Sequence, residues 1–180
     1  MGLLGGSFDP VHFGHLRAAE WSVGAFALDA VRLMPARQSP FKQASGASEE
    51  DRAEMVRLAI AGNENLGIEP VELRRPAPSY TVDTLRALRA SSPHDTFVLL
   101  LGSDAAAGLD KWREIDEIRR MAEIRVLIRP GTETIPEAVP FSGLAISASE
   151  IRELVRAKRS IRYLTPEPVR RYIQEKSLYQ

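Results

Sequence analysis

The chain has 180 residues, of which 44% are hydrophobic, and this is enough to bury one ordinary core. Lys and Arg number 24, as do Asp and Glu, which excludes a global field for nucleic acid or anionic membranes; any anion site must be built locally. There is no cysteine, which excludes disulfides, thiolate metal sites and a cysteine nucleophile and favours a reducing cytoplasm.

Apolar runs are short throughout the chain. The run FVLLL at 97–101 is far too short to span a bilayer. The N-terminus lacks the basic flank and long apolar stretch of a signal peptide. We therefore expect a cytoplasmic protein that contacts neither membrane nor nucleic acid.

These apolar runs alternate with stretches of helical periodicity. The pattern predicts strands at 3–4, 31–34, 66–71, 97–101 and 124–128, helices at 14–28, 49–61 and 81–90, helical pieces through 122, and terminal helices at 149–156 and 168–175. The runs at 97–101 and 125–128 are continuously apolar, which is typical of strands covered on both faces. We expect an α/β fold in a single domain, 1–180: a Rossmann-like open parallel sheet with helices on both faces over about 1–140, and a small C-terminal helical part over about 145–180.

Two segments interrupt this alternation. Residues 35–47 are rich in Pro, Ser, Gly and Gln and form a longer loop than a βα connection requires, which is typical of functional loops. Residues 130–140 form a second irregular stretch. Between them, Ser48-x-x-Asp51 is typical of a capping box at the start of a helix.

The stretch GGSFDPVHFGHL lies where the first predicted strand ends. In an open parallel sheet, ligands bind beyond the carboxyl ends of the strands. Gly5 and Gly6 allow a phosphate to approach the backbone, Ser7 adds a hydroxyl, and Gly14 precedes a helix whose first N–H groups attract anions. The pattern is neither G-x-G-x-x-G nor a P-loop. It predicts a phosphate site of another kind.

Two of the three histidines, His12 and His15, lie within this stretch. An imidazole can donate a hydrogen bond to a phosphoryl oxygen and can carry charge or not according to its surroundings. We therefore expect the two rings to flank one phosphorus. Two alternatives stay open: ordinary satisfied histidines at a helix start, or a metal site in which Asp9 is the third ligand.

The same stretch resembles the signature of the nucleotidylyltransferase superfamily, a glycine-terminated strand followed by Thr or Ser and by His-x-Gly-His. Further segments narrow the resemblance to the bacterial nicotinate-nucleotide adenylyltransferases: MPARQSPFK (34–42), PSYTVDT (78–84), LLGSD (100–104), Lys111-Trp112, IRPG (128–131), ISASEIR (146–152) and RYLTPEPVRRYIQEKSLY (162–179). The match runs nearly end to end. One departure is Phe41, which stands where the family usually has His.

The resemblance implies an enzyme of NAD biosynthesis. The 5′-phosphate of nicotinate mononucleotide would attack the α-phosphorus of ATP, giving deamido-NAD and pyrophosphate, with Mg²⁺ carried by ATP and no metal ligand from protein side chains. The implied catalytic residues are His12, His15, Lys42 and Arg152. The implied ATP-binding residues are Gly5, Gly6, Ser7, Phe8, Gly102, Asp104, Ile146, Ser147 and Ser149.

The pyridine end of the site is expected at Ser79, Tyr80 and Thr81, which begin a predicted helix. Free N–H groups and the positive end of the helix dipole favour the carboxylate of nicotinate over a neutral carboxamide. The resemblance implies that Trp112 stacks on the pyridine ring, and an indole packed in the core is the alternative. We assign Arg129, which ends a buried strand, to the mononucleotide phosphate.

Two assignments depend on where helices begin. Asp104 resembles the family's contact with the adenosine ribose, but it could equally be the N-cap of the next helix. Arg152 directly follows the run ISASEI and is expected in the first turn of a helix.

Two other functions stay open. A sister adenylyltransferase of the same superfamily would use pantetheine phosphate as the acceptor, although the segments at 78–84 and 112 do not fit it. A non-catalytic regulatory module would bind the nucleotide without turnover. The sequence is compatible with a homodimer and does not determine the oligomeric state.

Overall fold

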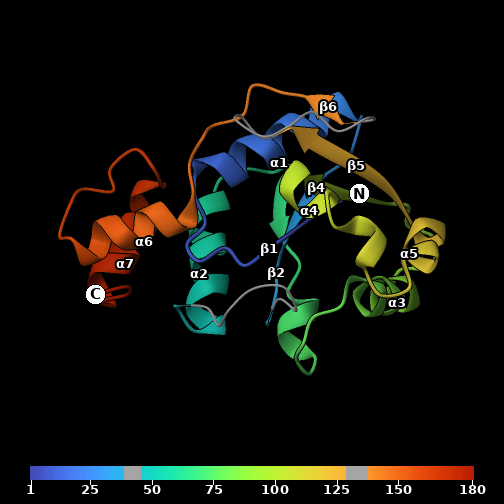
Figure 1. Cartoon of the computed structure of the whole chain (residues 1–180), viewed down its shortest axis with the longest axis horizontal. Coiled ribbons are helices and arrows are strands. Elements are labelled where there is room, and N and C mark those ends of the chain that lie inside the picture. The colour runs from blue at the N-terminus through green and yellow to red at the C-terminus, as the bar shows by residue number, and fades with distance from the viewer. Residues whose placement is uncertain (39–45, 129–137) are drawn as a thin grey trace.

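The computed structural model describes residues 1–38, 46–128 and 138–180 (Figure 1). Within these ranges, six strands form one parallel sheet in the order β3-β2-β1-β4-β5-β6. The elements, in chain order, are β1 (Gly2–Gly6), α1 (Phe13–Ala25), β2 (Val31–Pro35), α2 (Glu49–Ile60), β3 (Leu66–Ile68), the 3-10 helix η1 (Val71–Arg74), α3 (Thr81–Ser91), β4 (Phe97–Gly102), α4 (Ser103–Ala106), the 3-10 helix η2 (Leu109–Lys111), α5 (Ile115–Met121), β5 (Ala122–Ile128), β6 (Val139–Pro140), α6 (Ala148–Arg156) and α7 (Glu167–Glu175).

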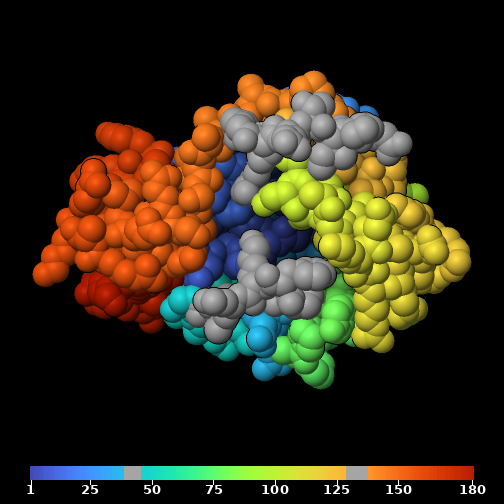
Figure 2. Space-filling model, viewed as in Figure 1, coloured from blue at the N-terminus to red at the C-terminus, as the bar shows by residue number. Residues whose placement is uncertain are grey.

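This order confirms the predicted Rossmann-like α/β fold. The chain builds the sheet outward from β1 in one direction and then, from β4, in the other. The crevice between β1 and β4 is therefore the switch point at which ligands bind in sheets of this kind. In Figure 2 the N-terminal residues, in blue, lie at the floor of a hollow between the C-terminal segment and the residues of α4 and α5.

Alternate residues of the central strands face two separate layers of the core. Leu4 and Leu100 belong to the cluster that also holds buried residues of α1 and α2. Leu3, Leu99 and Leu101 belong to the cluster formed with α3 and α5. Because helices cover both faces, the apolar run of β4 is buried without alternation, as predicted.

Serine caps determine where two helices begin. The Ser48 hydroxyl accepts a hydrogen bond from the Asp51 N–H (3.1 Å), which confirms the predicted start of α2. The Ser147 hydroxyl accepts one from the Glu150 N–H (3.1 Å) and starts α6 at Ala148. Each cap satisfies a backbone donor that has no partner within its helix.

Two predicted elements were wrong in detail. The strand expected over 66–71 ends at Ile68, and a 3-10 helix begins at Val71; Pro70 has no N–H to donate, so the ladder cannot run through it. The stretch 130–140, expected to be irregular, includes β6, in which Val139 pairs with Leu127.

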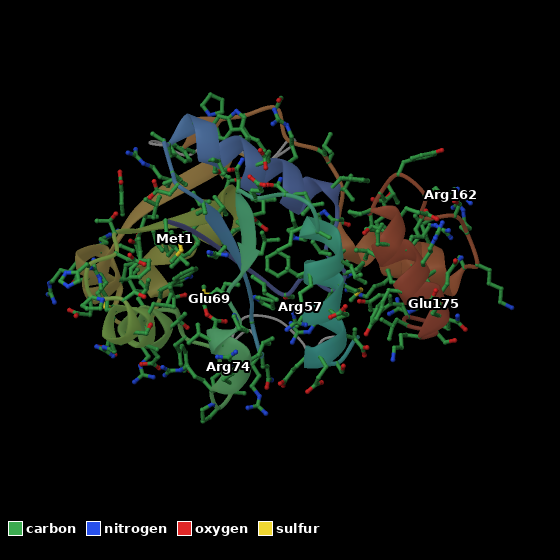
Figure 3. All side chains as sticks on the ribbon, turned by 180° about the vertical axis from the view of Figure 1, so that it is seen from behind. Met1, Arg57, Glu69, Arg74, Arg162 and Glu175 are labelled. Carbon is green, nitrogen blue, oxygen red and sulfur yellow. The ribbon has the colours of Figure 1, made fainter. Side chains whose placement is uncertain are left out.

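The C-terminal part packs against α2. Val169 and Ile173 of α7 are buried in the same cluster as Met55 of α2. From behind, α2 lies between the sheet and the C-terminal helices, with Arg162 and Glu175 on their outer side (Figure 3). Among the described residues, no helix has the length and apolar character that crossing a membrane requires.

Candidate active site

A cleft formed by three adjoining cavities runs along the carboxyl ends of β1 and β4. The histidine cavity, of about 590 Å³, lies between the β1–α1 loop, α6 and the start of α4. The tryptophan cavity, of about 180 Å³, shares Gly5, Gly6 and Ser7 with it and extends to the start of α3 and to Trp112. The arginine cavity, of about 290 Å³, opens next to it between η1 and α3 and includes Arg75. The cleft therefore lies at the switch point of the sheet, beyond the carboxyl ends of the strands, where the sequence predicts a ligand site.

His12 and His15 both line the histidine cavity, as the sequence predicts. Their rings stack with centroids 3.7 Å apart and an interplanar angle of 25°. The backbone N–H of His12 donates to Nδ1 of His15 (3.3 Å), so the ring proton of neutral His15 lies on Nε2. His12 is 1% exposed and yet remains part of the cavity wall. Both imidazole rings therefore border the same cavity.

Steric contact explains the glycine of the His-x-Gly-His pattern. A Cβ on Gly14 would lie 2.9 Å from Nδ1 of His12. We expected Gly14 to precede the helix. The helix starts at Phe13, however, so Gly14 lies in its first turn. Phe8 packs edge-on against His15, with centroids 4.9 Å apart. The glycine is therefore required by the histidine pair itself.

Asp9, which is close to the histidines in sequence, is hydrogen-bonded to other parts of the chain. Its carboxylate accepts hydrogen bonds from the N–H groups of Gly46 (2.7 Å) and Ala47 (3.1 Å) and from the hydroxyl of Tyr179 (2.7 Å). The described parts of the chain contain no cluster of His, Asp or Glu side chains that could hold a metal ion. The alternative of a metal site at His12, His15 and Asp9 therefore gains no support from the described residues.

Three predicted phosphate ligands of the α6 side, Ser147, Ser149 and Arg152, line the histidine cavity. Nη2 of Arg152 donates to the Ser149 hydroxyl (3.3 Å), and Nη1 donates to the backbone oxygen of Asp9 (2.6 Å). Because the Ser147 cap starts the helix early, Arg152 lies in the second turn and not, as predicted, in the first. Its guanidinium still reaches the cleft.

Other predicted ATP contacts are placed differently. Gly102 is the N-cap of α4, so Asp104 is not, and Asp104 lines the histidine cavity. Ile146 packs against the core and does not line any of the three cavities. Lys42 and Arg129 lie outside the described residues, and their assigned roles stay predictions.

The predicted pyridine residues meet at the tryptophan cavity. Ser79, Tyr80, Thr81 and Trp112 all line it. Tyr80 is the N-cap of α3, so the first N–H groups of that helix begin there, as predicted. Trp112 also packs against the second core cluster. Trp112 therefore both lines a cavity, as stacking on a ligand would require, and contacts the core, as the alternative holds.

Sequence reasoning missed Arg52, which is 1% exposed. Its guanidinium donates to the backbone oxygens of Ser7 (2.8 Å), Ala36 (2.6 Å) and Arg37 (3.0 Å). Burial lowers the pKa of this guanidinium. The signal was available, because Arg52 lies one helical turn before the buried Met55 and so faces the core. Arg52 ties the loops after β1 and β2 together below the cleft.

Glu72 was also missed. It is a buried carboxyl that lines the tryptophan and arginine cavities, and it accepts a hydrogen bond from the Thr84 hydroxyl (2.8 Å). Burial raises the pKa of Glu72 above its ordinary value. Through Thr84, this carboxyl fixes the first turn of α3.

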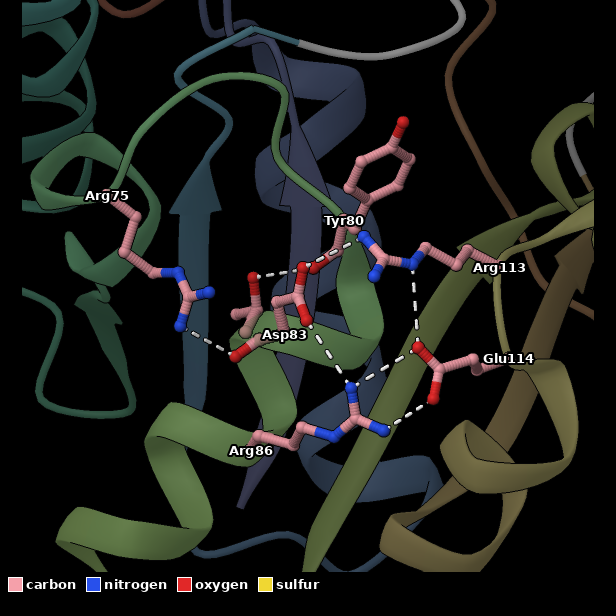
Figure 4. Close-up of polar contacts among 7 residues, drawn as sticks. Arg75, Tyr80, Asp83, Arg86, Arg113 and Glu114 are labelled. Atoms are coloured by element: carbon pink, nitrogen blue, oxygen red, sulfur yellow. Dashed lines mark hydrogen bonds and ion pairs between the residues drawn. The ribbon is translucent and has the colours of Figure 1, made fainter.

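Figure 4 shows a network of arginines and carboxylates, of which Arg75, Asp83 and Arg113 line the arginine cavity. The Arg113 guanidinium lies 5.0 Å from the Tyr80 ring centroid and within 3.6 Å of Asp83 and 3.5 Å of Glu114. Glu114 also accepts a hydrogen bond from Arg86, which lowers the pKa of Glu114. The network joins α3 to the segment that carries Trp112.

Comparisons with known proteins identify relatives of this chain. A family model described as cytidylyltransferase-like matches residues 3–154. A probable nicotinate-nucleotide adenylyltransferase of Exiguobacterium sibiricum is 40% identical over 185 residues, which cover 99% of this chain and 98% of the relative. One of Geobacillus thermodenitrificans is 43% identical over 184 residues, covering 99% and 85%.

Solved structures share the fold. The nicotinic acid mononucleotide adenylyltransferase of Plasmodium falciparum complexed with NaAD superimposes with a TM-score of 0.83 at 19% identity, covering 99% of this chain and 96% of that chain. The same enzyme complexed with APC gives a TM-score of 0.80 at 18% identity, with coverage of 99% and 96%. At such identity these two likenesses support the fold alone.

Proposed function

The chain belongs to the cytidylyltransferase-like family and, within it, to the nicotinate-nucleotide adenylyltransferases, and from this premise we propose that it transfers the adenylyl group of ATP to nicotinate mononucleotide. The products are deamido-NAD and pyrophosphate, and the reaction is a step of NAD biosynthesis. The observation that carries the proposal is the stacked pair His12 and His15, which lies in the cleft at the switch point of the sheet.

The chemistry is a single displacement. An oxygen of the mononucleotide phosphate bonds to the α-phosphorus of ATP, the bond from that phosphorus to the bridging oxygen of the β-phosphate breaks, and pyrophosphate leaves. The attacking phosphate is already ionised, so no side chain has to remove a proton from it. The main obstacle is repulsion between anions, about 4 kcal/mol for two unit charges at ~4 Å and an effective dielectric of ~20.

Donors placed around the phosphates offset this repulsion. In the proposed mechanism, His12 and His15 donate to the reacting phosphates and the guanidinium of Arg152 holds the triphosphate. Lys42 does the same from outside the described residues. Support for these roles comes from the cavity that the histidines and Arg152 line together.

Magnesium enters with ATP in this proposal. When bound, Mg²⁺ neutralises part of the triphosphate charge. In this proposal the phosphate oxygens of ATP would supply its ligands, and no metal ligand is assigned to a protein side chain. The protein contributes hydroxyls from Ser147 and Ser149 along the same cavity wall.

The acceptor end is the tryptophan cavity. We propose that the pyridine carboxylate lies at the N-terminus of α3, near Ser79, Tyr80 and Thr81, and that the ring stacks on Trp112. A carboxylate interacts more favourably with a helix N-terminus than a neutral carboxamide does. The enzyme is therefore expected to prefer nicotinate mononucleotide over nicotinamide mononucleotide. Arg129 is proposed to hold the mononucleotide phosphate.

A coupled assay of pyrophosphate release tests the proposal. Purified protein is supplied with ATP, Mg²⁺ and one acceptor, either nicotinate mononucleotide, nicotinamide mononucleotide or phosphopantetheine. The expected result is rapid release with nicotinate mononucleotide, slower release with the amide and none with phosphopantetheine. Release with phosphopantetheine alone would support the sister enzyme, and ATP binding without release from any acceptor would support the regulatory module.

Two further features are part of this proposal. We place the enzyme in the cytoplasm, and fractionation of cells tests this. A homodimer stays a prediction, which sedimentation of the purified chain tests.

A further inference from the structure

The penultimate residue of the chain reaches the loop that carries the histidines. The hydroxyl of Tyr179 donates to Oδ1 of Asp9 at 2.7 Å, across 170 positions of sequence. Tyr179 is 7% exposed and Asp9 is 4% exposed. The tyrosine ring packs closely on the backbone of Gly46, where an added Cβ would lie 3.1 Å from it. The contact is therefore buried and sterically fixed.

Asp9 stands between this hydroxyl and a proposed ligand of ATP. Nη1 of Arg152 donates to the backbone oxygen of Asp9 at 2.6 Å and lies 3.8 Å from its carboxylate Oδ2. The carboxylate itself accepts from two backbone N–H groups and from Tyr179. With these three donors in place, Arg152 bonds to the backbone and stays near the cleft without a close ion pair.

Removing one donor changes this balance. A buried carboxylate that loses a hydrogen bond pays a desolvation cost unless another donor replaces it. Arg152 is the charged donor already beside Asp9, and a charge-assisted bond to a carboxylate is strong. Burial, and then the charge of Asp9, raises the pKa of the Tyr179 hydroxyl, so that hydroxyl stays a donor.

We propose that Tyr179 is a positioning residue for adenylyl transfer: its hydroxyl occupies the carboxylate of Asp9 and so keeps the guanidinium of Arg152 available to the triphosphate. The inference rests on the proposed function, in which Arg152 binds ATP. It predicts that the hydroxyl controls the affinity for ATP and leaves the affinity for the mononucleotide unchanged.

A second tyrosine of the same segment provides a matched control. The hydroxyl of Tyr172 donates to Oδ1 of Asp51 at 2.8 Å and so also joins the C-terminal part to a carboxylate. Asp51 lies in the first turn of α2 and lines none of the three cavities. Tyr172→Phe therefore removes the same group from the same segment at a distance from the proposed ATP site.

The experiment compares Tyr179→Phe with Tyr172→Phe by steady-state kinetics and thermal unfolding. Tyr179→Phe is expected to raise the KM for ATP about tenfold, as the loss of one bond to a charged group would, and to leave the KM for nicotinate mononucleotide within twofold. Tyr172→Phe is expected to leave both KM values unchanged. An unchanged KM for ATP in Tyr179→Phe, or an equal rise in both variants, overturns the proposal.

A double-mutant cycle tests whether the effect passes through Arg152. In an Arg152→Gln background, Tyr179→Phe is expected to add no further rise in the KM for ATP, because no guanidinium remains to be drawn to Asp9. Additive effects would contradict this. If Tyr179→Phe fails to fold, 4-aminophenylalanine at 179, a weaker donor, is expected to give an intermediate KM for ATP; a wild-type KM there would overturn the proposal.

Binding of ATP, measured by calorimetry, separates this proposal from the proposed function. If the wild type binds ATP but forms no deamido-NAD, the proposed function is wrong, and a weaker Kd for ATP in Tyr179→Phe still supports the positioning role. If the wild type does not bind ATP, both proposals are wrong.

Discussion

The two ends of the cleft are held in different ways. Around the histidine cavity, buried side chains from distant parts of the chain tie down the loop after β1: Arg52 at Ser7, Tyr179 at Asp9, and Thr165, whose hydroxyl donates to Val11 at 2.8 Å. The tryptophan cavity is lined by residues of several elements from β1 to α5, and exposed ion pairs such as Arg86 with Glu114 join α3 to the segment of Trp112 beside it.

This difference matches the tasks we propose for the two ends. Stabilising charge in a transition state requires donors that do not move, and buried hydrogen bonds supply that rigidity. Recognising an acceptor tolerates adjustment, and exposed ion pairs contribute little to stability and can rearrange. Changes at the histidine end should therefore affect turnover, ATP binding or folding, and changes at the tryptophan end should affect binding of the acceptor.

The strongest test of the comparison is His15→Ala. It is expected to lower kcat by about 10²–10³-fold, because it removes a donor aimed at the reacting phosphates. Pyrophosphate release measures the effect, and thermal unfolding checks that the variant is folded. An unchanged kcat would remove His15 from the mechanism.

The second largest effect is expected from Arg52→Met, which should lower the stability of the fold. It leaves three backbone oxygens below the cleft without their donor, and the free energy of unfolding is expected to fall by about 3 kcal/mol in a urea titration. Arg57→Met, on the exposed side of the same helix, is the control and should change it by less than about 1 kcal/mol. Similar values for both variants would show that Arg52 does not anchor the loops.

Trp112→Ala sharpens the comparison at the other end. Loss of stacking is expected to raise the KM for nicotinate mononucleotide about tenfold, with the KM for ATP unchanged. Kinetics with each substrate varied in turn measure the split. A rise confined to ATP would reassign the indole to the other nucleotide.

The smallest effect is expected from Glu72→Gln, read as a pH dependence. The pKa of Glu72 in the folded protein lies above its ordinary value of 4.5, so the folded state holds this proton more tightly than the unfolded state. The contribution of Glu72 to stability is therefore fully present below pH 4.5 and is lost as the pH rises through the folded pKa. Glutamine stays neutral, so the variant should gain a few degrees in Tm over the wild type toward neutral pH. Parallel Tm curves for the two proteins would contradict this.

Much of the fold could be predicted because its signals are local. The continuously apolar run of β4, the Ser48 cap and the spacing of the βα units depend on neighbouring residues alone. Errors came where a longer-range partner decides the outcome, as at Val139, which becomes a strand only because Leu127 of β5 lies beside it.

The sequence by itself determined the α/β class, the family, and the position of His12, His15 and the start of α3 at one edge of the sheet. These features follow from motif spacing and from the order of strands and helices along the chain. Only the tertiary structure decided how that edge is held. The partners of Asp9 and Arg52 come from distant loops and from the C-terminal end. The pairing of a buried donor with its acceptor depends on how these distant segments pack, so it cannot be predicted from the periodicity of the sequence.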